Sequence, residues 1–217
     1  MPWPAIDVYS DPICPWCMIG RHRLARALKL AGGGTSGPGP AVRWRVFQLN
    51  PSMPAGGMDR TAYLAAKFGG AVQSQEVYRA IRKEGEAEGV RFAFDRIRRT
   101  PNTLKAHLLI RLAAGTGAGD AMAGRLFDAY FLEGRDIGDS SVLVELAADA
   151  GIAREVAQAW LEDEETAARL SAEDAEARAS GISGVPYFVI GGRYSLAGAA
   201  PPEVLVRAME LAAQTVS

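Results

Sequence analysis

The chain has 217 residues, 48% of them hydrophobic, which suffices for the core of one large domain or of one domain with an insertion. Its 24 basic residues are balanced by 25 acidic ones, so neither a nucleic acid nor a membrane surface is indicated as a partner. The first residues have neither the basic region nor the apolar run of a signal peptide, and no later stretch has the apolar length of a membrane span. We therefore expect a cytoplasmic protein.

The first elements surround a cysteine. Residues 5–9 alternate between apolar and polar side chains, which predicts a short strand, and turn-forming residues follow at 10–13. An apolar face over residues 15–30 predicts a helix, with Pro15 at its first position, where the missing N–H costs no hydrogen bond. Cys14 is therefore expected at the N-terminus of this helix, where free backbone N–H groups and the helix dipole favour a thiolate.

Cys14 and Cys17 are the two cysteines of the chain, so they can form one intramolecular disulfide. Three positions apart on a helix, their Cα atoms lie roughly 5 Å from each other, within the range that a disulfide spans. We expect Cys14 to attack a substrate disulfide, and the less exposed Cys17 to release the mixed disulfide that results. Disulfides in the cytoplasm are usually transient and catalytic, which favours this redox interpretation.

Two other roles of the cysteine pair are disfavoured. A structural disulfide would close so short a loop that it would remove little chain entropy. A zinc site would need further ligands, and the two histidines, His22 and His107, lack a regular metal-binding spacing, so we expect no metal. The role of His107 stays open.

The rest of the chain predicts an α/β layer interrupted by helices. Residues 32–40 are rich in glycine and proline and predict a loop, and residues 42–47 alternate like a second strand. Helical patterns follow at residues 62–68, 77–88, 104–114, 122–132, 142–150, 156–161 and 167–179. The chain is completed by a strand at 185–190, a glycine hairpin turn, a strand at 193–196 and a helix at 202–213.

Two stretches together carry a resemblance to a known family. They are residues 10–17, Ser-Asp-Pro-Ile-Cys-Pro-Trp-Cys, and residues 184–190, Gly-Val-Pro-Tyr-Phe-Val-Ile. Both resemble the DsbA family of thioredoxin-fold oxidoreductases, and within it the FrnE-like branch. Further similarity to that branch lies at residues 44, 47, 49–51, 102–103, 106–107, 127–131 and 133–134.

The resemblance implies an α/β, thioredoxin-like fold with an all-helical domain inserted after the second strand. The parts of the thioredoxin-like domain would be residues 1–57 and 163–217, and the inserted helical domain would be residues 58–162. The resemblance also implies a cis peptide bond between Val185 and Pro186, packed beside the cysteine pair.

Site residues follow from the same resemblance. The backbone of Val185 would pair with an extended substrate segment, and Trp16 is a second candidate substrate contact. Pro15 would support the cysteine turn. Periplasmic members resemble this chain but have a histidine where Trp16 stands, so we expect a less oxidising pair here.

The acid that many thioredoxin-like folds place six residues before the first cysteine is replaced here by Val8. Asp7, Asp11 or a water molecule would have to accept the proton of Cys17. The choice between them stays open.

The leading hypothesis is a cytoplasmic thiol-disulfide oxidoreductase that reduces or isomerises disulfides of proteins or small molecules. It would need no cofactor, although glutathione is a candidate redox partner or co-substrate, and a homodimer is a candidate assembly. One alternative is a glutathione-dependent isomerase or transferase like the 2-hydroxychromene-2-carboxylate isomerases and kappa-class transferases, which resemble this chain but typically have a serine at the position of Cys14. The other is a non-catalytic, chaperone-like binding module.

Overall fold

The computed structural model describes residues 3–32 and 39–214. Most of the loop predicted at 32–40 lies outside the described residues, as do the first two and the last three residues of the chain. Among the described residues, no helix combines the length and the apolar character needed to cross a bilayer.

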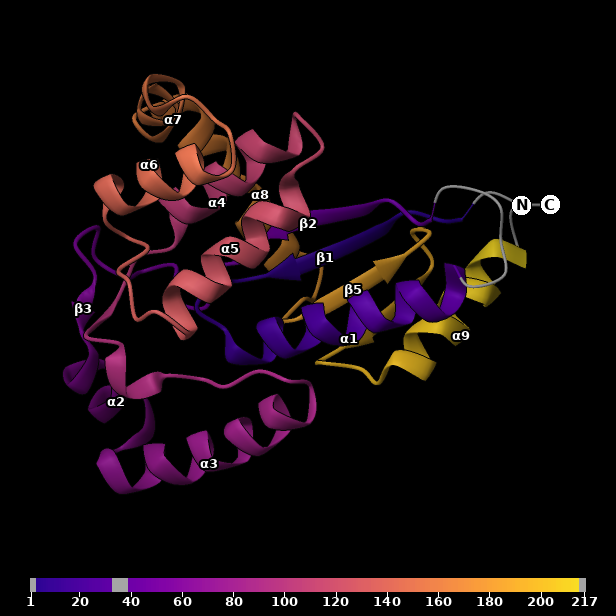
Figure 1. Ribbon diagram of the computed structural model, residues 1–217, viewed down its shortest axis with the longest axis horizontal. Coiled ribbons are helices and arrows are strands. Elements are labelled where there is room, and N and C mark those ends of the chain that lie inside the picture. Colours follow the sequence, from indigo (N-terminus) through magenta and orange to yellow (C-terminus); the bar gives the residue numbers. More distant parts are fainter. Residues whose placement is uncertain (1–2, 33–38, 215–217) are drawn as a thin grey trace.

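A four-stranded sheet forms the centre of the fold (Figure 1). Its strand order is β2-β1-β5-β6, with β1 at Ile6–Ser10, β2 at Val42–Val46, β5 at Tyr187–Ile190 and β6 at Tyr194–Ala197. β1 runs parallel to β2 and antiparallel to β5, and β6 pairs antiparallel with β5. Strand β5, from the end of the chain, thereby lies beside β1, with Tyr9 opposite Tyr187.

The alternation predicted for the first strand separates its side chains between the two faces of the sheet. Ile6 and Val8 are buried with Phe188 and Ile190 of β5 against one pair of helices. These helices are α1, Pro15–Gly32, and α9, Pro202–Gln214, which lie side by side over this face (Figure 1). Tyr9 and Tyr187 point to the other face and contact a small cluster that includes Phe47 and Ala177.

The chain between β2 and β5 forms a helical layer. Its helices are α2 at Arg60–Phe68, α3 at Ala71–Ala87, the 3₁₀ helix η1 at Phe94–Arg96, α4 at Leu104–Ala114, α5 at Gly119–Phe131, α6 at Ser140–Asp149, α7 at Arg154–Leu161 and α8 at Glu164–Ala179. The layer also contains a two-stranded ladder between β3, Met58–Asp59, and β4, Arg99–Thr100, so it is helical apart from these short strands. The boundaries at residues 58 and 162 stay a prediction.

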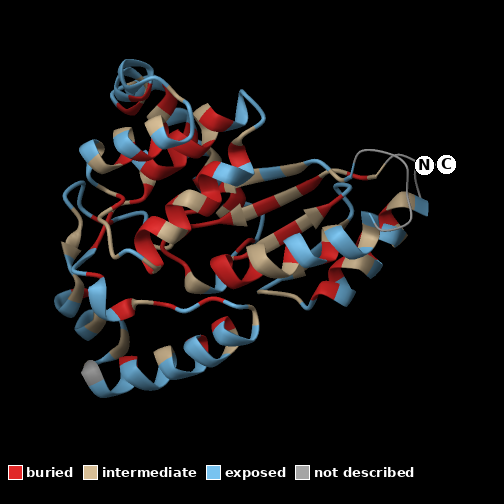
Figure 2. Ribbon diagram, in the orientation of Figure 1, coloured by how far each residue is buried: buried red, intermediate tan, exposed pale blue. Residues whose placement is uncertain are grey.

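The largest hydrophobic core connects this layer to the cysteine turn. Cys14, Cys17 and Met18 belong to the same buried cluster as Phe127 and Phe131 of α5. Figure 2 shows buried segments continuing from the central strands into the start of α1 and into α5. The environment of the cysteines is therefore built by residues from both parts of the chain.

Candidate active site

The two cysteines lie at the start of α1, immediately after the turn that follows β1. Cys14 directly precedes Pro15, the first residue of the helix, and its carbonyl accepts hydrogen bonds from the N–H groups of Cys17, at 3.0 Å, and Met18, at 3.3 Å. Both cysteines are free thiols. Cys14 keeps 4% of its surface exposed and Cys17 only 1%, so a substrate sulfur can reach Cys14 more readily.

A second segment meets the cysteine turn from far along the chain. The peptide bond between Val185 and Pro186 is cis. The Cys14 thiol donates a hydrogen bond of 3.5 Å to the carbonyl oxygen of Val185, 171 positions away. The carbonyl of Pro186 in turn accepts from the N–H of Gly198, just after β6, at 2.8 Å. Cys14, Val185 and Pro186, which the sequence predicted as site residues, are thus brought together.

Trp16 and Pro15 lie at the surface of the site. The Trp16 side chain is 37% exposed, which is unusual for so large an apolar group. Pro15 is half-buried beside it. An exposed indole next to a reactive thiol can contact the apolar part of an incoming substrate.

Gly20 is a site residue that the sequence analysis missed. It lies in the second turn of α1, where a Cβ atom would come within 2.9 Å of Pro186 Cγ and 3.4 Å of Phe188 Cζ. The absence of a side chain therefore allows the cis-proline segment to pack directly on the cysteine helix. A glycine inside a helix lowers stability relative to alanine, so its presence within the predicted helix could have indicated close packing at this position.

We expect Gly20→Ala to lower kcat/KM for disulfide reduction by about tenfold or more, because the added methyl must displace the rigid proline ring from the cysteine pair. Overpacking should also cost about 1–3 kcal/mol of unfolding free energy. The matched control is Gly32→Ala in the same helix, where no atom lies within 4 Å of the new Cβ. Steady-state kinetics and urea unfolding of both variants test this expectation, and equal behaviour of the two would contradict it.

Asp11 is a fully buried carboxyl group in the turn before Cys14. Its oxygens accept from the N–H of Ile13 at 3.2 Å and of Leu49 at 2.6 Å, and the Thr103 side chain hydrogen-bonds to it as well. Burial outweighs these donors and raises the pKa of Asp11 to about 7. The carboxyl group therefore connects the turns after β1 and β2 with the start of α4.

Of the two acids considered as proton acceptors for Cys17, Asp7 is engaged elsewhere. Its carboxylate forms an ion pair of 2.7 Å with Arg45 on the neighbouring strand β2. Asp11 lies in the correct turn, but three donors already surround its oxygens. Burial raises the pKa of Cys17 itself well above its ordinary value, so proton loss from this thiol needs assistance.

His107 lies in α4 with 4% of its surface exposed. Burial lowers the pKa of His107 to about 3, although the nearby carbonyl of Phe47 favours the protonated ring. Its Nε2 atom has no hydrogen-bond partner among the described residues. In the same part of the chain, no group of three or more histidine, cysteine, aspartate or glutamate side chains is arranged to hold a metal ion.

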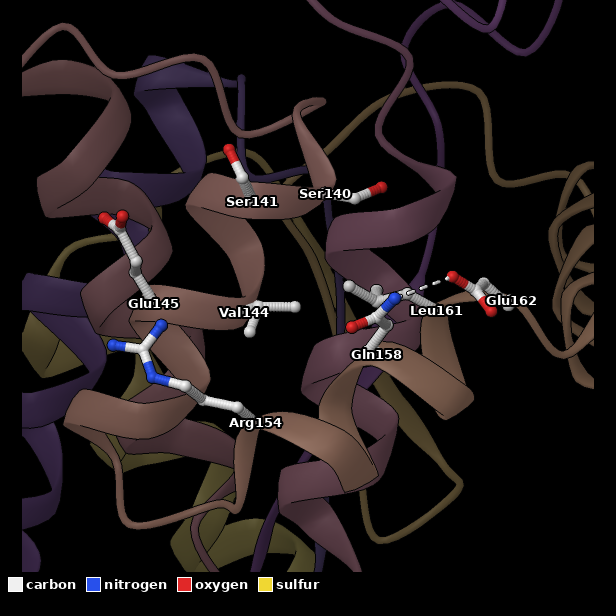
Figure 3. Close-up of a pocket in the computed structure, with 8 residues that line it drawn as sticks. All are labelled: Ser140, Ser141, Val144, Glu145, Arg154, Gln158, Leu161 and Glu162. Carbon is white, nitrogen blue, oxygen red and sulfur yellow. Dashed lines mark hydrogen bonds between the residues drawn. The ribbon is translucent and has the colours of Figure 1, made fainter.

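A pocket of about 330 Å³ lies between α6 and α7, away from the start of α1 (Figures 1 and 3). Figure 3 shows Glu145 and Arg154 on one side of it, and on the other Gln158, which donates a hydrogen bond to Glu162. None of the residues that line it belongs to the cysteine turn or to the Val185-Pro186 segment. This pocket is separate from the candidate active site.

Comparison with known families agrees with this geometry. The family model described as DSBA-like thioredoxin domain matches residues 5–210. The chain belongs to this family. A solved DsbA-like structure, the probable DsbA oxidoreductase from Streptomyces coelicolor, is 30% identical, with a TM-score of 0.83 over 98% of this chain and 91% of that chain.

Two more distant structures have the DsbA-like fold in common with this chain. A 2-hydroxychromene-2-carboxylate isomerase is 16% identical, with a TM-score of 0.71 and 98% of each chain covered. The cytosolic disulfide reductase DsbM from Pseudomonas aeruginosa, solved with GSH, is 22% identical, with a TM-score of 0.60 over 97% of this chain and 96% of that chain. An isomerase and a reductase thus both have this fold, so the fold by itself does not decide the reaction.

Proposed function

We propose that this DsbA-like protein is a cytoplasmic thiol-disulfide oxidoreductase that reduces or isomerises disulfide bonds through Cys14 and Cys17. The observation that carries the proposal is the pair of free thiols at the start of α1, with the Cys14 sulfur against the Val185 carbonyl. The similarity to the probable DsbA oxidoreductase supports the same reaction class.

The reaction would proceed in two exchange steps. The Cys14 thiolate attacks one sulfur of a substrate disulfide, a Cys14-substrate bond forms, and the other substrate sulfur leaves as a thiolate with the bonding electrons. Cys17, as thiolate, then attacks the Cys14 sulfur, the Cys14-Cys17 disulfide forms, and the second substrate sulfur leaves. The substrate gains two electrons and the protein loses two.

The proline segment and Trp16 would hold the substrate during these steps. The Val185 carbonyl accepts from the Cys14 thiol in the resting protein and becomes available to a substrate N–H once that thiol has reacted. An extended substrate segment would then pair with the backbone next to Pro186. The exposed indole of Trp16 would cover the apolar part of that segment.

Glutathione is the proposed electron donor. Two glutathione thiols would return the Cys14-Cys17 disulfide to the dithiol and leave as oxidised glutathione, which balances the cycle. The cytoplasmic glutathione pool would keep an oxidising pair reduced, and this favours reduction or isomerisation over net oxidation. The relative DsbM, a cytosolic disulfide reductase solved with GSH, is consistent with this choice.

The alternative, a glutathione-dependent isomerase or transferase, differs from the proposed dithiol enzyme in the side-chain atom at position 14. Enzymes that activate the glutathione thiol instead of their own typically have a hydroxyl where this chain has the Cys14 sulfur. The second thiol at Cys17, within disulfide distance along the helix, has no use in such a mechanism. These two features favour the dithiol reaction.

The test is a redox titration of the purified protein against glutathione buffers, with the state of each cysteine measured by alkylation and mass. We expect a reversible two-electron transition that involves both cysteines. Reduction of a model disulfide and refolding of a scrambled disulfide protein then distinguish a reductase from an isomerase. A pair that stays reduced across the whole titration would exclude the proposal.

A further inference from the structure

The release of a mixed disulfide requires the Cys17 thiol to ionise although it is buried. Cys17 is 1% exposed, and burial raises the pKa of its thiol more than any other cause. The neighbouring Cys14 sulfur raises the pKa of Cys17 further, as a hydrogen-bond acceptor and through its charge. A donor that reaches the Cys17 sulfur is therefore needed when Cys17 has to attack.

Ser10 has such a donor. It is the last residue of β1, 3% exposed, and its backbone is paired with Val46 of β2, which fixes its position. Its hydroxyl makes no hydrogen bond of ordinary geometry with any described residue. That hydroxyl nevertheless lies against the Cys17 thiol, close enough to lower its pKa.

A buried hydroxyl without a partner costs free energy, unless another state of the protein uses it. A neutral thiol is a poor acceptor, whereas a thiolate is a strong one. The hydroxyl can rotate about its C–O bond, so it can point its proton at the sulfur as soon as Cys17 ionises. We propose that Ser10 donates a hydrogen bond to the Cys17 thiolate during release of the mixed disulfide.

Other groups around Cys17 do not replace this donor. The backbone of Asp11 also hydrogen-bonds to the thiol and lowers the pKa of Cys17, but by less than Ser10 does, while the Asp11 carboxyl group accepts from Ile13, Leu49 and Thr103. The Cys14 sulfur, which also acts on Cys17, is bound to substrate at this stage and carries no charge. Ser10 is thus a side-chain donor beside the reacting sulfur. The inference rests on the proposed dithiol mechanism.

The first measurement concerns ionisation and needs no turnover. In a Cys14→Ala background, the ultraviolet absorbance of the Cys17 thiolate is followed against pH with Ser10 and with Ser10→Ala. We expect the Ser10→Ala substitution to raise the pKa of Cys17 by about one unit or more, the range for a hydrogen bond to a charged group. An unchanged pKa would overturn the inference.

The second measurement concerns the reaction. With Cys14 and Cys17 both present, a preformed mixed disulfide between Cys14 and glutathione should release glutathione roughly tenfold to a hundredfold more slowly in Ser10→Ala. Ser10→Thr keeps the hydroxyl and should restore most of the rate. Ser180→Ala, which removes a hydroxyl bound to the Glu176 carbonyl in another part of the chain, is the matched control and should release at the parent rate.

Stability separates this role from a structural one. Because the Ser10 hydroxyl has no ordinary hydrogen bond to any residue that the structure describes, Ser10→Ala should unfold at the same urea concentration as the parent or higher. A marked loss of stability, or a release rate that Ser10→Thr fails to restore, would assign Ser10 to packing. If the glutathione titration finds no redox transition, the proposed function fails. If it finds a transition, but Ser10→Ala releases glutathione from the mixed disulfide at the parent rate, this inference alone fails.

Discussion

Replacing Cys14 with serine is expected to lower disulfide turnover by roughly a thousandfold or more, because a hydroxyl is far less ionised and less nucleophilic than a thiol near neutral pH. The nearly isosteric change should leave the fold intact, since serine can also donate the hydrogen bond that the Cys14 side chain makes to the Val185 carbonyl. The assay is reduction of a small-molecule disulfide with glutathione as donor.

The matched variant is Cys17→Ser, which keeps the attacking sulfur and removes the resolving one. It should also lose turnover, but for a different reason: the substrate stays attached to Cys14, and the adduct is visible by mass. Cys14→Ser should form no adduct. A Cys14→Ser variant with full activity would contradict the dithiol mechanism and favour glutathione-dependent isomerisation or simple binding.

The second large effect concerns the pH dependence of stability. Asp11 has its pKa raised from 3.8 to about 7 in the folded protein, so the folded state holds this proton more tightly than the unfolded chain does. The stability that Asp11 contributes is complete below pH 3.8 and is lost as the pH rises to about 7. His107 has its pKa lowered from 6.5 to about 3, so its contribution is complete above pH 6.5 and is lost as the pH falls to about 3.

Between about pH 4 and pH 6.5, the contributions of Asp11 and His107 to the free energy of unfolding change with pH in opposite directions, each by about 1.4 kcal/mol per pH unit. The two changes therefore nearly cancel in the parent protein. Asp11→Asn should therefore gain stability relative to the parent as the pH rises across this window, by about 3 kcal/mol in total. His107→Leu should lose a similar amount over the same window, because only the slope of Asp11 remains.

Urea unfolding of the reduced proteins at several pH values between 4 and 7 measures this difference. Comparing each variant with the parent removes the common contribution of surface carboxylates. The expected outcome is two difference curves that diverge in opposite directions. Parallel curves for the parent and both variants would show that neither group titrates differently in the folded and unfolded states.

The local pattern of apolar and polar residues was sufficient to predict most of the helices and strands. The alternation at residues 5–9 became β1, and the apolar face at 15–30 became α1 with Pro15 at its first position. The helix predicted at 104–114 has the observed bounds of α4. Such features depend on side chains a few positions apart, and these are visible in a sequence.

Helix and strand segments without a clear apolar pattern in the sequence were predicted less accurately. The helix predicted at 77–88 begins earlier, at Ala71. Residues 72–76 are mostly polar and their valine, Val72, is exposed, so they form no apolar stripe that predicts a helix. The ladder between β3 and β4 has two residues on each side, too few for an alternation to appear. Its paired residues, Asp59 with Arg99 and Met58 with Thr100, are 40 and 42 positions apart in the chain, so their pairing depends on the packing of the helices in between.

The same division holds for the candidate site. From the sequence by itself, Cys14 and Cys17 could be assigned to the start of a helix, and resemblance to the DsbA family pointed to Val185 and Pro186. Only the tertiary structure showed that Gly20 accommodates the proline ring, that Asp11 is fully buried and that the Ser10 hydroxyl lies against Cys17. The physical reason is that burial and contact depend on which distant segments cover a residue, whereas helix and strand patterns depend on neighbours along the chain.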